Sequence, residues 1–332
     1  MRKLMIGALF LILLFVGMTN VGCDGASTSW TPPVNPVNPV NPVNPVEPST
    51  GMVSFIEDTG SDNGSLPLYS SLWKQQAATL PGVNRTTRNV YAMNNNGTGL
   101  KKLNDQPFDF HSVYMLPDGS KLVFAGHAAD GYSQIYFVQL GGKTFEPVQL
   151  TSTPGHKMDP MLSTDGSKIV FMYANLESEK FDIAVMNADG SNQYVIPTPA
   201  GWYIWHPAIS PDGTKIAVEM WNEKNDMHPI YLMNADGSNL SRLTHLANDG
   251  YPAFSPDGKQ VVFSSLSFSL GVFTINTDGT GMKHLGDGWD PIFVGDQILY
   301  VGWAGPDYHE QIYSSAKRLT NSQNHDAFEL SL

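Results

Sequence analysis

The stretch from Trp205 to Thr244 reads WHPAISPDGTKIAVEMWNEKNDMHPIYLMNADGSNLSRLT. It contains two turn motifs, Ser210-Pro211-Asp212-Gly213 and Asn234-Ala235-Asp236-Gly237, each flanked by short segments rich in Ile, Val, Tyr and Leu. Proline presets φ at the first turn position, Asp bonds to nearby backbone, and Gly accepts a positive φ. The stretch therefore predicts a meander of four antiparallel strands.

This unit recurs along the chain. The first turn returns at Asp118, Asp165, Asp212 and Asp257, which are steps of 47, 47 and 45 residues. The second turn returns at residues 94–97, 187–190, 234–237 and 276–279. A period of forty-odd residues with four strands per repeat is typical of propeller blades.

The repeated motif, SPDG followed by two strands and MNADGSN-x-x-x-LT, resembles the TolB-type propeller repeat, a WD40-like (PD40) repeat. The match is strongest from Asp159 to Leu285, and the preceding repeat replaces its second turn with residues 140–143, LGGK. The resemblance implies an all-β propeller fold. TolB proteins also carry an α/β domain, and related peptidases carry a hydrolase domain. We expect neither here, and the chain has no Gly-x-Ser-x-Gly nucleophile motif.

The two ends of the repeat region complement each other. Leu243 is followed twelve residues later by Ser255, at the end of an inner strand, and Leu319 is followed at the same offset by Ser331. The last residues thus predict an inner strand that no blade follows. Residues 52–56 predict the second strand of a blade, and no inner strand precedes it. Pairing the two removes open sheet edges. We therefore expect a six-bladed β-propeller of four-stranded antiparallel blades, closed by the C-terminal strand joining blade one.

Two segments precede the propeller. Residues 1–22 have basic residues followed by an apolar run, which is typical of a signal peptide too short to span a membrane. Cys23, the only cysteine, follows Val21-Gly22 and resembles the lipidated cysteine of a bacterial lipoprotein box. Asn20 stands where that box usually has Leu. The alternative is ordinary cleavage near Gly22 or Ala26 that leaves a free thiol.

Residues 23–50 form the lipidated cysteine and a linker, and residues 51–332 the propeller. Proline recurs mostly every third residue in the linker, which predicts a stiff polyproline II stalk. The chain has 19 Lys and Arg against 31 Asp and Glu. This acidity disfavours nucleic acid and anionic lipid surfaces as partners, and leaves the lipid anchor as the expected membrane contact. We expect an extracytoplasmic, membrane-anchored lipoprotein of the periplasm or cell surface.

In a four-stranded meander the two tight turns lie on one face, and the variable loops lie on the other. By our strand boundaries the variable face holds eight of the nine histidines and six of the seven tryptophans. Loops on a rigid scaffold often carry binding groups. We expect Trp205 and Trp289 to pack between blades, and Trp73, Trp221 and Trp303 to contact a ligand.

One set of side chains should surround the mouth of the central channel, because each precedes an inner strand. Its members are Ser112 or His111, Asp159, His206, Tyr251, Asp290 and His325. Imidazoles and carboxylates that converge can bind a ligand, and Asp159, His206, Asp290 and His325 are candidates to coordinate a divalent cation. The alternative is that they bond the neighbouring blade and hold water. No other cofactor is expected.

Two functional classes fit these observations. The first is a non-catalytic scaffold that binds a protein or peptide segment of the cell envelope at the channel mouth. The second follows from the resemblance, because propellers with this repeat include oligogalacturonate lyases, which are metal-dependent and cleave polysaccharides. The lyase class needs a base, and the lysines that we place on the variable face are Lys74, Lys157, Lys180 and Lys224. The first class, with no enzyme activity, is favoured, and an oligosaccharide remains the alternative ligand.

Overall fold

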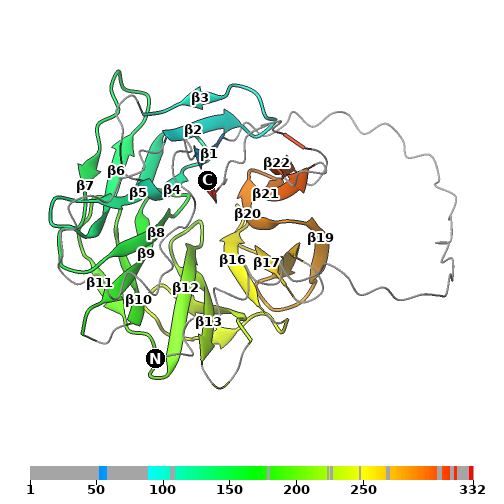
Figure 1. Ribbon diagram of the computed structural model, residues 1–332. Helices are drawn as coiled ribbons and strands as arrows, with labels where there is room; N and C mark the ends of the chain where they lie inside the picture. Colours follow the sequence, from blue (N-terminus) through cyan, green and yellow to red (C-terminus); the bar gives the residue numbers. More distant parts are fainter. Residues whose placement is uncertain are drawn as a thin grey trace, which may run out of the picture. The chain divides into compact units, whose positions relative to one another are not determined.

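Short β-strands make up the regular structure of the chain, as shown by a computed structural model (Figure 1). The structure describes residues 52–57, 89–104, 108, 110–177, 180–222, 224, 227–246, 248–266, 270–304, 309–314, 318–319 and 329–331. No membrane-spanning helix is present in this part of the chain.

The strands form six sheets, and neighbouring strands within each sheet pair in antiparallel fashion. The first sheet runs β23 (Glu329–Ser331), β1 (Met52–Glu57), β2 (Asn89–Asn94), β3 (Lys101–Lys102). The second runs β4 (Phe110–Met115), β5 (Lys121–His127), β6 (Ser133–Gln139), β7 (Val148–Gln149). The third runs β8 (Lys157–Leu162), β9 (Lys168–Asn175), β10 (Lys180–Asn187), β11 (Tyr194–Ile196).

The remaining three sheets follow the same plan. The fourth runs β12 (Trp202–Ile209), β13 (Lys215–Asn222), β14 (Ile230–Asn234), β15 (Ser241–Arg242). The fifth runs β16 (Asp249–Phe254), β17 (Gln260–Ser265), β18 (Gly271–Asn276), β19 (Lys283–Asp287). The sixth has three strands, β20 (Trp289–Val294), β21 (Gln297–Ala304) and β22 (His309–Ser314).

The sheets are blades arranged around a centre, which confirms the predicted all-β propeller (Figure 1). The first strands of successive blades, β4, β8, β12, β16 and β20, contact their neighbours in that order, and β23 contacts both β20 and β4. The C-terminal strand pairs with β1 as predicted, with Ser54 opposite Ser331 and Ile56 opposite Glu329. Five of the six sheets have the expected four strands within the described residues.

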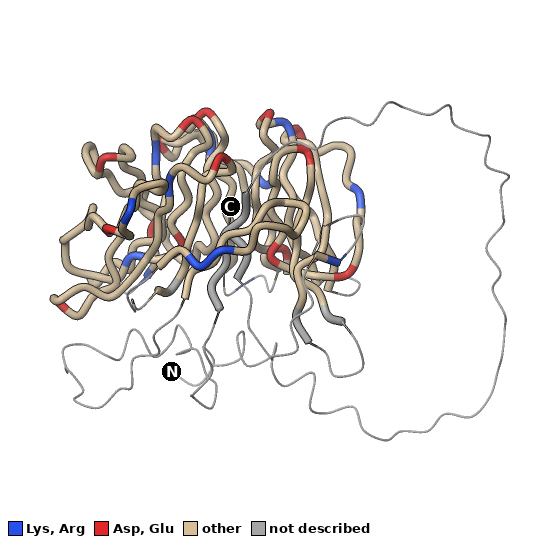
Figure 2. The backbone as a smooth tube through the Cα atoms, turned by 90° about the horizontal axis from the view of Figure 1, so that it is seen from above, with Lys and Arg blue, Asp and Glu red and all other residues tan. Residues whose placement is uncertain are grey.

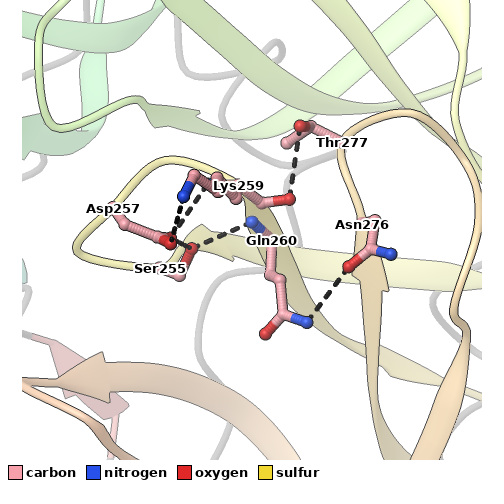
Figure 3. Close-up of polar contacts among 6 residues, drawn as sticks. All are labelled: Ser255, Asp257, Lys259, Gln260, Asn276 and Thr277. Atoms are coloured by element: carbon pink, nitrogen blue, oxygen red, sulfur yellow. Dashed lines mark hydrogen bonds and ion pairs between the residues drawn. The ribbon is translucent and has the colours of Figure 1, made fainter.

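The tight turns form by local hydrogen bonding. In the first turn of the fifth sheet, the Ser255 hydroxyl donates to Asp257 and accepts from the Gln260 N–H, which orders the turn (Figure 3). Gly258 takes the positive φ of 69° that the turn requires. In the next turn, Gln260 Nε2 donates to Asn276 Oδ1, which links the turns of adjacent strands on the same face (Figure 3).

Apolar side chains from facing sheets bury one another and hold the blades together. Phe254, Phe263 and Phe273 of the fifth sheet pack with Ala217 and Ile230 of the fourth. Full burial of each such large side chain stabilises the fold by about 1.5–3 kcal/mol. Acidic and basic residues are interspersed around the edge of the ring (Figure 2). The apolar contacts between neighbouring blades therefore stabilise the ring and help to fix the inner strands around the centre.

Candidate functional site

The predicted channel residues lie inside the inner strands, not just before them. Asp159 belongs to β8, His206 to β12, Tyr251 to β16 and Asp290 to β20. Each inner strand carries a β-bulge at this point, where one extra residue shifts its register against the second strand. The expectation that these residues precede their strands was therefore wrong. A bulge interrupts the ladder and re-aims a side chain without ending the strand.

All four residues adopt a left-handed backbone conformation, with φ values of 48° at Asp159, 47° at His206, 54° at Tyr251 and 53° at Asp290. A non-glycine residue in this region costs about 1–3 kcal/mol and persists only where its surroundings impose it. A proline follows each of them, at positions 160, 207, 252 and 291. Proline is tolerated because the inner strand is an edge of its sheet. The repeated X-Pro dipeptide was a sequence signal for this ring.

The bulges surround a cavity of about 80 Å³. It is lined by Asp159, His206, Tyr251 and Asp290, each with its following proline, and by Ser112 of β4. The structure thus brings together four of the predicted residues, and in blade two it places Ser112 at the cavity. The Asp159 N–H donates to Ser112 Oγ at 3.1 Å, and the Asp290 N–H donates to Ser264 Oγ at 3.0 Å. Hydroxyl groups of the preceding blade thus hold the backbone of two bulges, both across a blade boundary.

Glu219 of β13 bridges two imidazoles beside this cavity. His206 Nδ1 lies 2.9 Å from one carboxylate oxygen and His228 Nδ1 lies 2.8 Å from the other. Glu219 is buried, and the next blade approaches it so closely that a Cβ on Gly250 would lie 2.8 Å from Oε2. The His206 ring stacks on Tyr251 with centroids 4.0 Å apart. Glu219 was not among the predicted site residues, because nothing in its local sequence pattern distinguishes it from a solvated charge.

The charges at the cavity influence one another. Burial raises the pKa of Asp159, and the nearby His206 and the hydroxyl of Ser112 oppose that rise. Burial by itself lowers the pKa of His206, but its hydrogen bond to Glu219 and the charges of Glu219, Asp159 and Asp290 raise it overall. Burial would raise the pKa of Glu219, but the hydrogen bonds from the two imidazoles lower it. The arrangement favours an ionised carboxylate at Glu219 between two imidazoles.

Trp221 does not offer a free ring face. It lies on strand β13, is partly buried, and stacks with Tyr203 at 4.3 Å and with His228 at 5.1 Å between centroids. Tyr203 lies opposite Trp221 on β12, and His228 lies in the segment that leads into β14, so the indole packs between two rings. The expectation that Trp221 is exposed in a loop was wrong, because β13 extends to Asn222 and Trp221 pairs with Tyr203 across the sheet. Trp221 therefore orders His228.

Two of the four lysines assigned to the variable face are engaged within the fold. Lys157 is fully buried, and its Nζ donates to the carbonyl oxygens of Thr153, Pro154 and Gly155, the last at 2.8 Å. Burial lowers the pKa of Lys157 to about 8. Lys180 Nζ lies over the Tyr203 ring, 5.2 Å from its centroid. Both amines act as structural cations, and neither lines the cavity.

Several predicted residues lie outside the described part of the chain, namely Cys23, Trp73, Lys74 and His325. His111 lies on β4 and Trp303 on β21. Among the described residues, no three His, Cys, Asp or Glu side chains are grouped so as to hold a metal ion. The four-residue metal set includes His325 and therefore stays a prediction.

Comparison with solved structures places this geometry in a known fold. A TolB structure from Agrobacterium tumefaciens matches with a TM-score of 0.57 and 18% identity, over 85% of this chain and 91% of that one. TolB from Acinetobacter baumannii matches with a TM-score of 0.59 and 16% identity, over 84% and 66%. The fold is that of a TolB-like β-propeller.

A further solved structure resembles this TolB-like propeller, and the comparisons by sequence found no match. A chain in a nidogen/laminin complex matches with a TM-score of 0.58 and 13% identity, over 85% of this chain and 99% of that one. No protein-family model and no curated protein matches the sequence. At these identities the likeness concerns the fold alone.

Proposed function

We propose that this TolB-like propeller is a non-catalytic scaffold of the cell envelope that binds a segment of a partner protein at its channel mouth. The observation that carries the proposal is the ring of four left-handed residues around the cavity. Strain of this kind marks sites where a fixed side-chain direction serves binding or chemistry. The ring directs acidic, imidazole and phenol groups to one point.

The size of the cavity favours binding over enclosure of a substrate. At about 80 Å³ it is well below the roughly 300–1,000 Å³ of pockets that enclose a small molecule. A partner must therefore lie across the mouth and place one small group inside. Tyr251 is 42% exposed at this point and offers an aromatic contact to such a partner. The matching chain of the nidogen/laminin complex was solved bound to a protein, which supports a protein as the partner.

The proposal includes an anchor and a closed ring. Cys23 is the lipidated residue, residues 24–50 are the tether, and the protein lies outside the cytoplasm. The ring has six blades, with residues 318–319 as the outer strand of the last blade. In support, the Leu319 N–H donates to the Ile312 carbonyl at 2.7 Å, as the Leu243 N–H does to Ile230 at 2.8 Å in the fourth sheet.

Site-specific photocrosslinking in intact cells tests the proposal. A benzophenone amino acid replaces Tyr251 in one variant and Met282 in the control, which is 48% exposed beside the second tight turn of the same blade. We expect a discrete protein adduct from Tyr251 and none from Met282. The adduct should fractionate with membranes, and should become soluble when Cys23→Ser is added. Equal adducts at both positions, or none at Tyr251, would contradict the proposal.

A further inference from the structure

One hydrogen-bond acceptor at the cavity has no donor among the residues that line it. The Oδ2 atom of Asp159 is buried and has no hydrogen-bond partner. A buried carboxylate oxygen without a donor costs more than a neutral group in the same position. Asp290 lines the same cavity, and both carboxylates act on His206. The described lining contains no Lys or Arg side chain.

We propose that the cavity receives the cationic end of one Lys or Arg side chain from the bound partner. This inference rests on the proposed function and specifies the chemistry of the partner. An ammonium or guanidinium group donates charge-assisted hydrogen bonds, which are roughly twice as strong as neutral ones. It would satisfy Asp159 Oδ2 and would lie between Asp159 and Asp290.

The volume of the cavity favours the tip of a single side chain as its occupant. One water needs about 10–15 Å³ by the same measure, so about 80 Å³ admits several waters or the end of one side chain. The prolines that follow the ring residues have no N–H, so they offer no backbone donors to a bound anion. The charged side chains of the lining are thus the carboxylates of Asp159 and Asp290 beside the His206 imidazole, and no Lys or Arg of the described lining pairs with either carboxylate.

Short peptides test the inference without knowledge of the partner. The probes are acetylated and amidated pentapeptides, Gly-Ser-X-Ser-Gly, in which X is Arg, Lys, Gln or norleucine, and calcium chloride alone serves as the metal probe. Binding is followed by NMR shifts of the labelled protein. We expect the Arg or Lys peptide to bind at least tenfold tighter than the Gln and norleucine peptides, with shifts centred on the cavity residues.

Charge variants separate the cavity from general acidity. Asp159→Asn and Asp290→Asn should each reduce the preference for the cationic peptide at least fivefold. Asp236→Asn removes the same charge from an exposed tight turn and should leave the preference unchanged. Melting curves of each variant verify that the propeller remains folded. Retention of the preference in both cavity variants, or its loss in Asp236→Asn, would overturn the inference.

The other outcomes are equally decisive. Equal binding of the Gln and Arg peptides, or no binding of any peptide, overturns the inference. Calcium binding that excludes the cationic peptide also overturns it, and makes the cavity a metal site. A Tyr251 adduct that forms equally well in Asp159→Asn refutes the cationic group while the proposed scaffold function stands. Absence of any Tyr251 adduct refutes the scaffold function itself.

Discussion

The tight turns and the inner-strand ring solve the same problem, a sharp change in chain direction, in opposite ways. In the turn at Asp212, the carboxylate accepts from the Ser210 hydroxyl and from the N–H and hydroxyl of Thr214, all within four residues. In the ring, His206 bonds Glu219 thirteen residues away and stacks on Tyr251 from another blade. Turns are therefore satisfied locally, whereas the ring exists only in the assembled propeller.

The two regions also differ in exposure and strain. The turns place Gly at positive φ, as at Gly213 with 68°, and the aspartates stay in contact with water. The ring places Asp, His and Tyr at positive φ around a cavity. A local, solvated motif tolerates the loss of one bond, because water replaces it. A buried, long-range network does not, since its remaining groups are left without partners.

The largest effect should come from removing the carboxylate of Glu219, which joins His206 of the inner-strand ring to His228. Glu219→Ala leaves two imidazoles without their partner in a buried site, so we expect it to lower the free energy of unfolding by about 3 kcal/mol. Chemical denaturation measures this, with the exposed Glu177→Ala as the control, expected within about 0.5 kcal/mol. Similar costs for the two variants would show that the ring is no more tightly coupled than a surface loop.

An intermediate effect should appear with pH at His156. Its Nδ1 accepts the Ser133 N–H at 3.2 Å, which requires the neutral imidazole. Burial, and then the charges of His127 and Lys157, lower the pKa of His156 to about 4. Because this folded-state pKa lies below the usual 6.5, the unfolded chain binds more protons between these values, and stability is lost as pH falls from 6.5 towards 4.

The measurement for His156 is the difference between wild type and His156→Gln, because other histidines titrate as well. We expect the wild type to lose about 1–2 kcal/mol more than His156→Gln between pH 7.5 and 4.5, less than the full shift implies, since the ring keeps some contact with water. The exposed His284→Gln serves as the control and should follow the wild type. Parallel curves for wild type and His156→Gln would contradict the assignment.

The smallest effect should come from the turns. Asp212→Ala removes three hydrogen bonds but leaves Gly213 in place, and the two donors of Thr214 lie at an exposed turn, so we expect a loss of about 1 kcal/mol. Asp212→Asn retains an acceptor oxygen and should stay within about 0.5 kcal/mol of wild type. Denaturant midpoints compare the three proteins. A cost for Asp212→Ala as large as that of Glu219→Ala would remove the distinction between the two regions.

The sequence predicted the elements whose causes are local or repeated. The turn motifs at Asp118, Asp165, Asp212 and Asp257 marked the blades, and the offset that ends at Ser331 predicted the pairing with β1. Alignment of the repeats also selected the four residues that line one cavity. This succeeded because a repeat places equivalent residues at equivalent positions around a ring.

Tertiary structure alone decided what those positions became. The bulges depend on the neighbouring blades, since Asp159 is held by Ser112, 47 residues earlier. Glu219 was not among the predicted site residues and Trp221 was expected to contact a ligand, yet contacts distant in sequence made one a buried bridge and the other a covered ring. Propensity and turn chemistry act within a few residues, whereas burial and charge at the channel come from strands far apart in sequence, and only the closed propeller brings them together.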